Sequence, residues 1–157
     1  MELAARPLRD TDVWTPETLP DALAPLARRQ ILYASRVSAG PPLPTEDDAE
    51  RVATLDEVIG ATPETTFFLG VEGDSMVDAC IHDGDLLVVD RTRQPADGDI
   101  VVAALNGELT VKRLRHRNGL AFLLPENPDY APIEVDEYSD LTVWGVVTHV
   151  LHDVRRS

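Results

Sequence analysis

Short apolar stretches separated by turn residues make up the chain from residue 67 onward. Six of them are rich in β-branched or apolar residues and predict strands: 67–71, 86–90, 99–105, 108–114, 120–124 and 141–151. Between these strands lie four tight-turn pairs: Asp83-Gly84, Asp97-Gly98, Asn106-Gly107 and Asn118-Gly119. The pair Asn106-Gly107 gives the strongest hairpin signal, because Asn-Gly favours a two-residue type I′ turn. The pattern predicts a mainly-β domain.

The first 46 residues have a different character. They hold seven of the chain's 12 prolines. Prolines at this density break helices and remove the N–H donors that a sheet needs. We therefore expect residues 1–46 to form an extended N-terminal arm with little regular structure, with at most a helical turn or two within 26–36. Residues 47–157 are then expected to form the folded domain.

A short helix is expected at residues 55–59. Thr54 and Glu57 have the spacing of a capping box, in which each residue bonds the other's backbone N–H. Gly60 then provides a stop, because glycine readily adopts the left-handed conformation that ends a helix.

The net charge of −14 is confined to the body of the chain. Residues 1–39 hold five acids and five arginines, so the remaining 23 acids and nine bases account for the whole charge. This balance argues against direct binding of a nucleic-acid backbone. The single cysteine, Cys80, excludes an internal disulfide and fits a reducing compartment. With no membrane-length apolar run and no signal peptide, we expect a cytoplasmic protein that does not enter membranes.

Lys112 is the only lysine among 14 basic residues. Arginine does not give up its proton in a protein, whereas a desolvated lysine can become a neutral amine. In strand alternation Lys112 shares one face with Thr110 and Leu114, in an apolar segment that would desolvate it. The ordinary alternative is that an arginine-rich composition leaves few lysines, and that this one simply faces water.

Ser75 lies in the turn-like sequence Gly73-Asp74-Ser75-Met76, directly after a predicted strand. A serine at such a junction can present its hydroxyl outward, beside free backbone N–H groups. The amides of Ser75 and Asp74 are candidates to hold an oxyanion. A neutral Lys112 could accept the Ser75 proton during attack on a carbonyl. Alternatively, Ser75 only caps the turn.

Other nucleophile arrangements are weaker. Cys80 and His82 lie two residues apart and could form a Cys–His pair, although free cysteines are usually buried. His149 and His152 could serve a Ser–His arrangement, but their positions are typical of ordinary strand-end residues.

We expect no metal and no cofactor. Asp83, Asp85 and Asp90 are interpreted as turn and strand-end residues, because the remaining ligands of a calcium loop are missing. No group of His, Cys, Asp and Glu residues has the spacing typical of metal ligands, and no Gly-rich phosphate loop occurs.

Several blocks of the chain, in order, resemble the LexA/UmuD self-cleaving proteins. They are GDSMVD at 73–78, DGDLLVVD at 83–90, GDIVVAA at 98–104 and GELTVKRL at 107–114, with VWGVVTHV at 143–150 resembling UmuD in particular. The resemblance covers about residues 52–152. It implies the β-clip fold that LexA shares with signal peptidases. It also implies that Ser75 is the nucleophile and that Lys112 is the general base.

The resemblance further implies that the chain cleaves its own arm at a bond between a small residue and glycine. Ala39-Gly40 lies between arm and body, 35 residues before Ser75, and is our predicted scissile bond. Taken alone, Ala-Gly is also typical of a flexible linker. The arm is longer than is usual in UmuD, and Ala-Gly is the LexA pair, whereas Cys-Gly is common in UmuD.

By this resemblance the protein is a UmuD-like, homodimeric accessory subunit of an error-prone Y-family translesion polymerase in the SOS response. A RecA–single-stranded DNA filament would stimulate its cleavage. One alternative is a LexA-like repressor, but 39 neutral, proline-rich residues are too few for a winged helix-turn-helix module. A non-catalytic interaction module would not need Lys112. A signal peptidase would share the Ser–Lys chemistry but would need a membrane anchor.

Overall fold

The computed structural model describes residues 30–33, 39–41 and 50–155. These described residues fall into two compact units, with the boundary between residues 62 and 63. The division between arm and domain at residues 46 and 47 remains a prediction.

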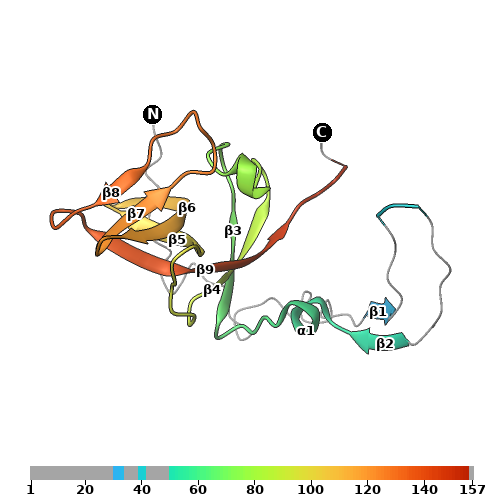
Figure 1. Ribbon diagram of the computed structural model, residues 1–157. Helices are drawn as coiled ribbons and strands as arrows, with labels where there is room; N and C mark the ends of the chain where they lie inside the picture. Colours follow the sequence, from blue (N-terminus) through green and yellow to red (C-terminus); the bar gives the residue numbers. More distant parts are fainter. Residues whose placement is uncertain (1–29, 34–38, 42–49, 156–157) are drawn as a thin grey trace. The chain divides into compact units, whose positions relative to one another are not determined.

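The first unit contains a two-stranded antiparallel sheet and a short helix. Strand β1 (Gln30–Tyr33) lies beside β2 (Glu50–Ala53) (Figure 1). In this antiparallel pair Gln30 is opposite Ala53. The prediction of a helical turn within residues 26–36 is therefore wrong at 30–33, where the structure has a strand. The rest of that range lies outside the described residues. Ile31 and Tyr33 belong to residue types that favour strands, and pairing with β2 prevails over a weak helical pattern.

Helix α1 (Leu55–Ile59) has the predicted bounds and caps. The Thr54 N–H donates to the Glu57 carboxylate at 2.9 Å, and the Glu57 N–H donates to the Thr54 hydroxyl at 3.1 Å. Gly60 ends the helix in the left-handed conformation, with φ of 68°.

The second unit is built on a seven-stranded antiparallel sheet with strand order β3-β4-β9-β5-β6-β7-β8 (Figure 1). Its strands are β3 (Thr66–Gly70), β4 (Leu86–Asp90), β5 (Ile100–Leu105), β6 (Glu108–Arg117), β7 (Leu120–Leu124), β8 (Ile133–Val135) and β9 (Leu141–Leu151). A single 3-10 turn, η3 (Val77–Ala79), lies between β3 and β4. The prediction of a mainly-β protein is confirmed. Only the short β8 was missing from the predicted strands of this unit.

The two Asn-Gly pairs form the hairpin turns on either side of β6. Asn106 and Gly107 have φ of 50° and 84°, and Asn118 and Gly119 have φ of 52° and 78°. Positive φ at both central residues is what a type I′ turn requires. These turns set the registers of the β5–β6 and β6–β7 pairs, and therefore decide which β6 side chains share a face.

Strand β9 joins two parts of the sheet. Its first half pairs with β5 and its second half with β4, and Val146 is paired with both Val101 and Asp90. The registers of both pairings shift near this crossing, at Val88/Val89 and at Val102/Ala103. Such irregularities increase the local twist and bend of a strand. The β3–β4 part and the β5–β8 part are therefore held together by one long strand.

The sheet has an apolar cluster on each face of β5. Val102 packs in one cluster with Met76, Ile81, Leu87 and Val89. Its neighbours Val101 and Ala103 pack in the other, with Leu114, Leu123 and Val146. Because alternate residues point to opposite faces, a strand covered on both faces has a continuous apolar sequence.

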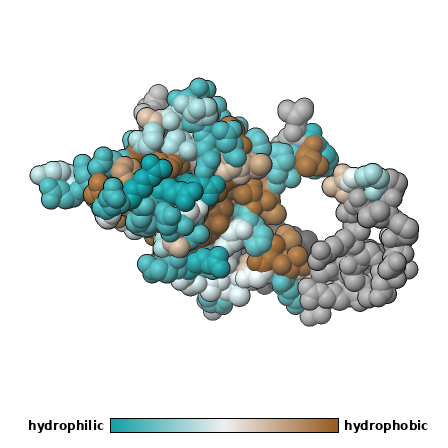
Figure 2. Space-filling model, in the orientation of Figure 1, coloured by the Kyte–Doolittle hydropathy of each residue, from teal (hydrophilic) through white to brown (hydrophobic). Residues whose placement is uncertain are grey.

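Hydrophilic and apolar side chains are mixed over the face of the molecule shown in Figure 2. Several large apolar residues of the second unit are exposed: Phe68, Leu86, Leu120, Tyr130, Tyr138 and Val154. Scattered exposed apolar residues of this kind are normal on a protein surface.

Candidate active site

Ser75 lies in the connection between β3 and β4, between an exposed residue and a buried one. Asp74 is exposed, whereas Met76 is 1% exposed and belongs to the core. Ile81, at the other end of the turn, is equally buried. Two core side chains therefore anchor the segment, and Ser75 remains only partly buried between them.

Lys112 reaches this serine from β6, where it lies opposite Val101. Its Nζ is 2.8 Å from the Ser75 Oγ, 3.0 Å from the Thr110 Oγ1 and 2.9 Å from the Val111 carbonyl oxygen. The structure thus brings together two polar side chains that are 37 residues apart. The contact with Thr110 agrees with the predicted shared face of β6.

Lys112 is 9% exposed, and burial lowers the pKa of its ammonium group below the usual value of 10.5. Within the part of the chain that the structure describes, no carboxylate pairs with Lys112. A nearby carboxylate would favour the charged form, so its absence leaves desolvation as the dominant influence. Desolvation favours the neutral amine, the form that can accept a proton from a hydroxyl group at hydrogen-bond distance.

Two backbone hydrogen bonds join the Ser75 segment to the residues after β7. The Glu126 N–H donates to the Ser75 carbonyl at 2.8 Å, and the Asp78 N–H donates to the Glu126 carbonyl at 2.8 Å. The Glu126 carboxylate pairs with Arg113, whose guanidinium also donates to the Gly98 carbonyl at 2.7 Å. Because Arg113 is next to Lys112 on β6, this network fixes the serine segment relative to the strand that carries the lysine.

The loop after β7 makes two further contacts with Asp74. Asn127 donates from its Nδ2 to the Asp74 carbonyl at 3.0 Å, and the Tyr130 hydroxyl donates to the Asp74 carboxylate. The carboxylate raises the pKa of Tyr130, because it stabilises the protonated phenol. This loop was not identified from the sequence. Its proline-rich Pro125-Glu126-Asn127-Pro128 stretch was the only local signal, and such a stretch predicts a loop but no contact.

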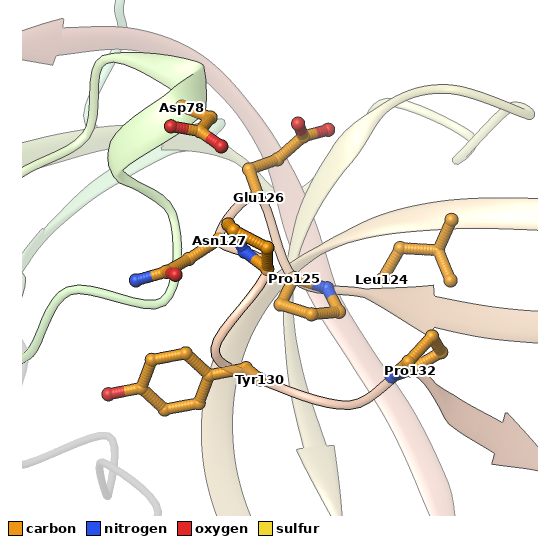
Figure 3. Close-up of a pocket in the computed structure, with 8 residues that line it drawn as sticks. Asp78, Leu124, Pro125, Glu126, Asn127, Tyr130 and Pro132 are labelled. Carbon is orange, nitrogen blue, oxygen red and sulfur yellow. The ribbon is translucent and has the colours of Figure 1, made fainter.

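A pocket opens beside the same loop (Figure 3). Asp78 contributes to it from η3, and the other lining residues come from the end of β7 and the loop that follows: Leu124, Pro125, Glu126, Asn127, Pro128, Tyr130 and Pro132. Asn127 points toward the segment that carries Asp74, as its hydrogen bond requires (Figure 3). Two of the lining residues, Glu126 and Asn127, are thus hydrogen-bonded to the segment that carries Ser75.

The predicted oxyanion donors are compatible with the observed backbone. Among the described residues, neither the Ser75 N–H nor the Asp74 N–H has a hydrogen-bond partner. Unpaired N–H groups beside a hydroxyl can receive an anionic oxygen. Their assignment as the oxyanion hole remains a prediction.

Ala39 and Gly40 are described as part of an exposed bend that includes Pro41. They belong to the first unit, whereas Ser75 and Lys112 belong to the second. An exposed backbone is accessible to cleavage. That the Ala39–Gly40 bond is the scissile bond remains a prediction.

The alternative nucleophile arrangements receive no support from the geometry. Cys80 is free and exposed, although free cysteines are usually buried, and among the described residues it forms no hydrogen bond with His82. His149 is hydrogen-bonded to the Thr148 hydroxyl, and His152 to the carboxylate of Asp85, the residue just before β4. Neither of these histidines is bonded to Ser75.

Over the described ranges, no helix is long and apolar enough to cross a membrane. The fold and the site define a mainly-β protein in which a buried lysine is hydrogen-bonded to a serine on a well-anchored turn. The chain belongs to the Peptidase S24-like family, whose model matches residues 31–148. The resemblance to the LexA/UmuD proteins is thereby confirmed.

Comparison with curated proteins gives the same family. The chain is 42% identical to Protein ImpA of Salmonella typhimurium over 125 residues, which is 79% of this chain and 84% of ImpA. It is 43% identical to Protein MucA of Escherichia coli over 120 residues, or 76% of this chain and 82% of MucA. It is also 40% identical to the LexA repressor of Bordetella petrii over 141 residues, or 87% of this chain and 62% of the repressor.

Proposed function

We propose that this protein is a serine endopeptidase that cleaves its own chain between Ala39 and Gly40. One observation carries the proposal, namely the 2.8 Å contact between the Nζ of the buried Lys112 and the Oγ of Ser75. A lysine used only for stability or solubility has no need to be desolvated against a hydroxyl group. Membership of the Peptidase S24-like family supports peptidase chemistry at this site.

The reaction proceeds in two halves. Neutral Lys112 takes the proton from the Ser75 hydroxyl as Oγ attacks the Ala39 carbonyl carbon, and the N–H groups of Ser75 and Asp74 stabilise the oxyanion. The Lys112 ammonium then protonates the departing Gly40 nitrogen, which leaves an ester between Ala39 and Ser75. Water, deprotonated by Lys112, attacks this ester, and the returning proton restores the Ser75 hydroxyl.

Thr110 is a positioning residue for Lys112, since its hydroxyl lies 3.0 Å from Nζ. Thr110→Val should slow self-cleavage by about 5-fold, because losing one ordinary hydrogen bond changes a free energy by about 1 kcal/mol. The rate is measured by following loss of the intact chain on gels over a range of pH. Thr110→Ser keeps the hydroxyl and should restore most of the rate. Equal rates for Val and Ser variants would contradict this role.

Self-cleavage should accelerate as pH rises. Burial lowers the pKa of Lys112, so the neutral amine begins to accumulate below the pH at which an exposed lysine would lose its proton. Below that pKa the rate should increase by about 10-fold per pH unit, and it should level off before pH 10.5, the ordinary value. Rates between about pH 7 and about pH 10 provide the measurement. A rate that falls as the pH rises over this range would exclude lysine as the base.

In the cell, we propose a UmuD-like role in the SOS response. The cleaved protein forms a homodimer and joins a Y-family translesion polymerase, and a RecA–single-stranded DNA filament stimulates the cleavage. The order of the sequence blocks and the similarity to ImpA and MucA support this role. No direct contact with nucleic acid is required, in keeping with a net charge of −14.

The test of this role compares cleavage at neutral pH with and without RecA, single-stranded DNA and a nucleotide. The proposal predicts faster cleavage only when all three are present. A polymerase of the same class should then retain the cleaved chain more strongly than the intact Ser75→Ala chain. Acceleration by none of these additions would contradict the SOS role and leave the peptidase assignment standing.

A LexA-like regulator is the second candidate. It is favoured by the 40% identity to the LexA repressor of Bordetella petrii. A regulator of this kind binds operator DNA before cleavage and releases it afterwards. Sequence-specific retention of a DNA duplex by the Ser75→Ala chain would favour this candidate over the polymerase subunit.

A further inference from the structure

Three side chains with metal-binding atoms meet at the end of the β4–β9 pair, outside the Ser75 site. Leu86, the first residue of β4, lies opposite Leu151, the last residue of β9. Continuing this register by one residue places Asp85 opposite His152. His82 comes from the turn that leads into Asp85, three residues earlier in the chain.

The geometry of this His–Asp–His cluster (His82, Asp85 and His152) is close. The His152 Nδ1 lies 2.5 Å from one Asp85 carboxylate oxygen, and the His82 Nδ1 lies 3.7 Å from the other. The two imidazole rings are 5.3 Å apart between centroids. One ligand atom from each of the three residues lies within 4.8 Å of the other two.

In the cluster the Asp85 carboxylate is buried and held in place, whereas the imidazoles of His82 and His152 are half-exposed and have room to rotate. The Asp85 side chain is 2% exposed, whereas those of His82 and His152 are 48% and 45% exposed. The carboxylate is held in place by the His82 backbone N–H, which donates to it at 2.8 Å. Burial raises the pKa of Asp85. Hydrogen bonds from His152 and the His82 backbone lower the pKa by more than burial raises it, so the pKa lies below its usual value. The carboxylate is therefore charged at neutral pH.

We propose that His82, Asp85 and His152 bind a divalent transition-metal ion, with zinc as the first ion to test. Two imidazoles and a carboxylate are a donor set suited to zinc, cobalt and nickel, whereas magnesium and calcium prefer oxygen ligands alone. Zinc lies about 2.0–2.2 Å from such atoms, so two ligand atoms on one ion are about 4 Å apart or closer. Small rotations of the half-exposed imidazoles bring the observed spacing into this range.

The strongly acidic body of the chain favours the approach of a cation. Three protein ligands leave a fourth, tetrahedral position for water. No metal was expected from the sequence, because the ligands have no recognisable spacing: His152 is 67 residues from Asp85. Only the pairing of β4 with β9 brings them together.

An ion at this position would tie the end of β9 to the turn before β4. The same turn supports the Ser75 segment, since the Gly73 N–H donates to the Asp83 carboxylate at 2.7 Å. Zinc should therefore raise the melting temperature of the second unit, as any ligand that binds only the folded state does.

The test titrates zinc and cobalt into the full-length, tag-free chain carrying Ser75→Ala and Cys80→Ser. These two substitutions keep the chain uncut and remove the exposed thiol, so the result does not depend on self-cleavage. Calorimetry with zinc and the visible absorption of cobalt should both show one ion per chain.

The chain has four histidines, two in the cluster and two outside it, which provides matched controls. His82→Ala or His152→Ala should weaken zinc binding by at least roughly 100-fold, because even outer-shell partners of a metal contribute about 10- to 100-fold. His116→Ala and His149→Ala should bind like the parent. Circular dichroism verifies that each variant is folded. Absence of zinc binding by the parent, or equal binding by all four variants, would overturn the proposal.

Discussion

Lys112→Ala is expected to slow self-cleavage at neutral pH by on the order of 1,000-fold, because a general base contributes about 100- to 10,000-fold. The Lys112 Nζ lies 2.8 Å from the Ser75 hydroxyl oxygen. Among the described residues, no other ionisable side chain is hydrogen-bonded to Ser75. No neighbouring group is therefore placed to take over the proton. The rate is measured from the fraction of intact chain over several days.

Lys112→Arg is the informative control for this prediction. It keeps the positive charge and a long side chain, but the guanidinium does not lose its proton. It should be as inactive as Lys112→Ala, and combining Ser75→Ala with either change should have little further effect, because residues that act as a unit are not additive. Cleavage by Lys112→Arg at the wild-type rate would show that Lys112 is not the base.

Gly145→Ala should be among the most destabilising single-methyl changes in the chain. An added Cβ would lie 2.6 Å from the Asp90 carbonyl oxygen and 2.7 Å from the Val89 Cγ1. The first of these atoms is backbone, so relief requires β4 and β9 to separate where β9 passes from β5 to β4. Overpacking of this kind costs about 1–3 kcal/mol. The melting temperature should fall by about 10 °C at the upper end of that range.

Gly70→Ala is a matched control for Gly145→Ala. Gly70 also lies in a strand, its φ is not in the left-handed region, and a Cβ there would meet no atom within 4 Å. Thermal denaturation followed by circular dichroism should give Gly70→Ala a melting temperature close to that of the wild type. If Gly145→Ala had the same melting temperature as Gly70→Ala and the wild type, the close approach of β4 and β9 at Gly145 would not limit the stability of the fold.

The short helix and the hairpin turns could be predicted because each is determined by residues that are close together in the sequence. The capping box of Thr54 and Glu57 and the turn at Asn106-Gly107 each depend on a few neighbouring residues, and both form as expected. By contrast, β1 needs β2 as a partner, and the propensity of four residues does not reveal a partner that lies 17 residues downstream (50 − 33). Strand β8 is only three residues long, so its alternation of apolar and polar residues is too short to predict a strand.

At the candidate active site, too, features set by neighbouring residues could be predicted, and contacts between distant segments could not. Ser75 and Lys112 were identified because each stands out in its own segment, one in a turn and one as the only lysine. The support that Glu126 gives to the Ser75 segment depends on where the loop after β7 lies in space. The meeting of Asp85 with His152 depends on the register of two strands. Neither arrangement leaves a pattern that a single sequence displays.

The most direct test of the account is intact-mass analysis of the purified wild-type chain held at alkaline pH. Self-cleavage at the proposed bond should give two products, residues 1–39 and residues 40–157, with the second beginning at Gly40. Neither product should form in Ser75→Ala. A chain that stays intact at every pH and in the presence of RecA, single-stranded DNA and a nucleotide would contradict the account, as would the same two fragments from Ser75→Ala.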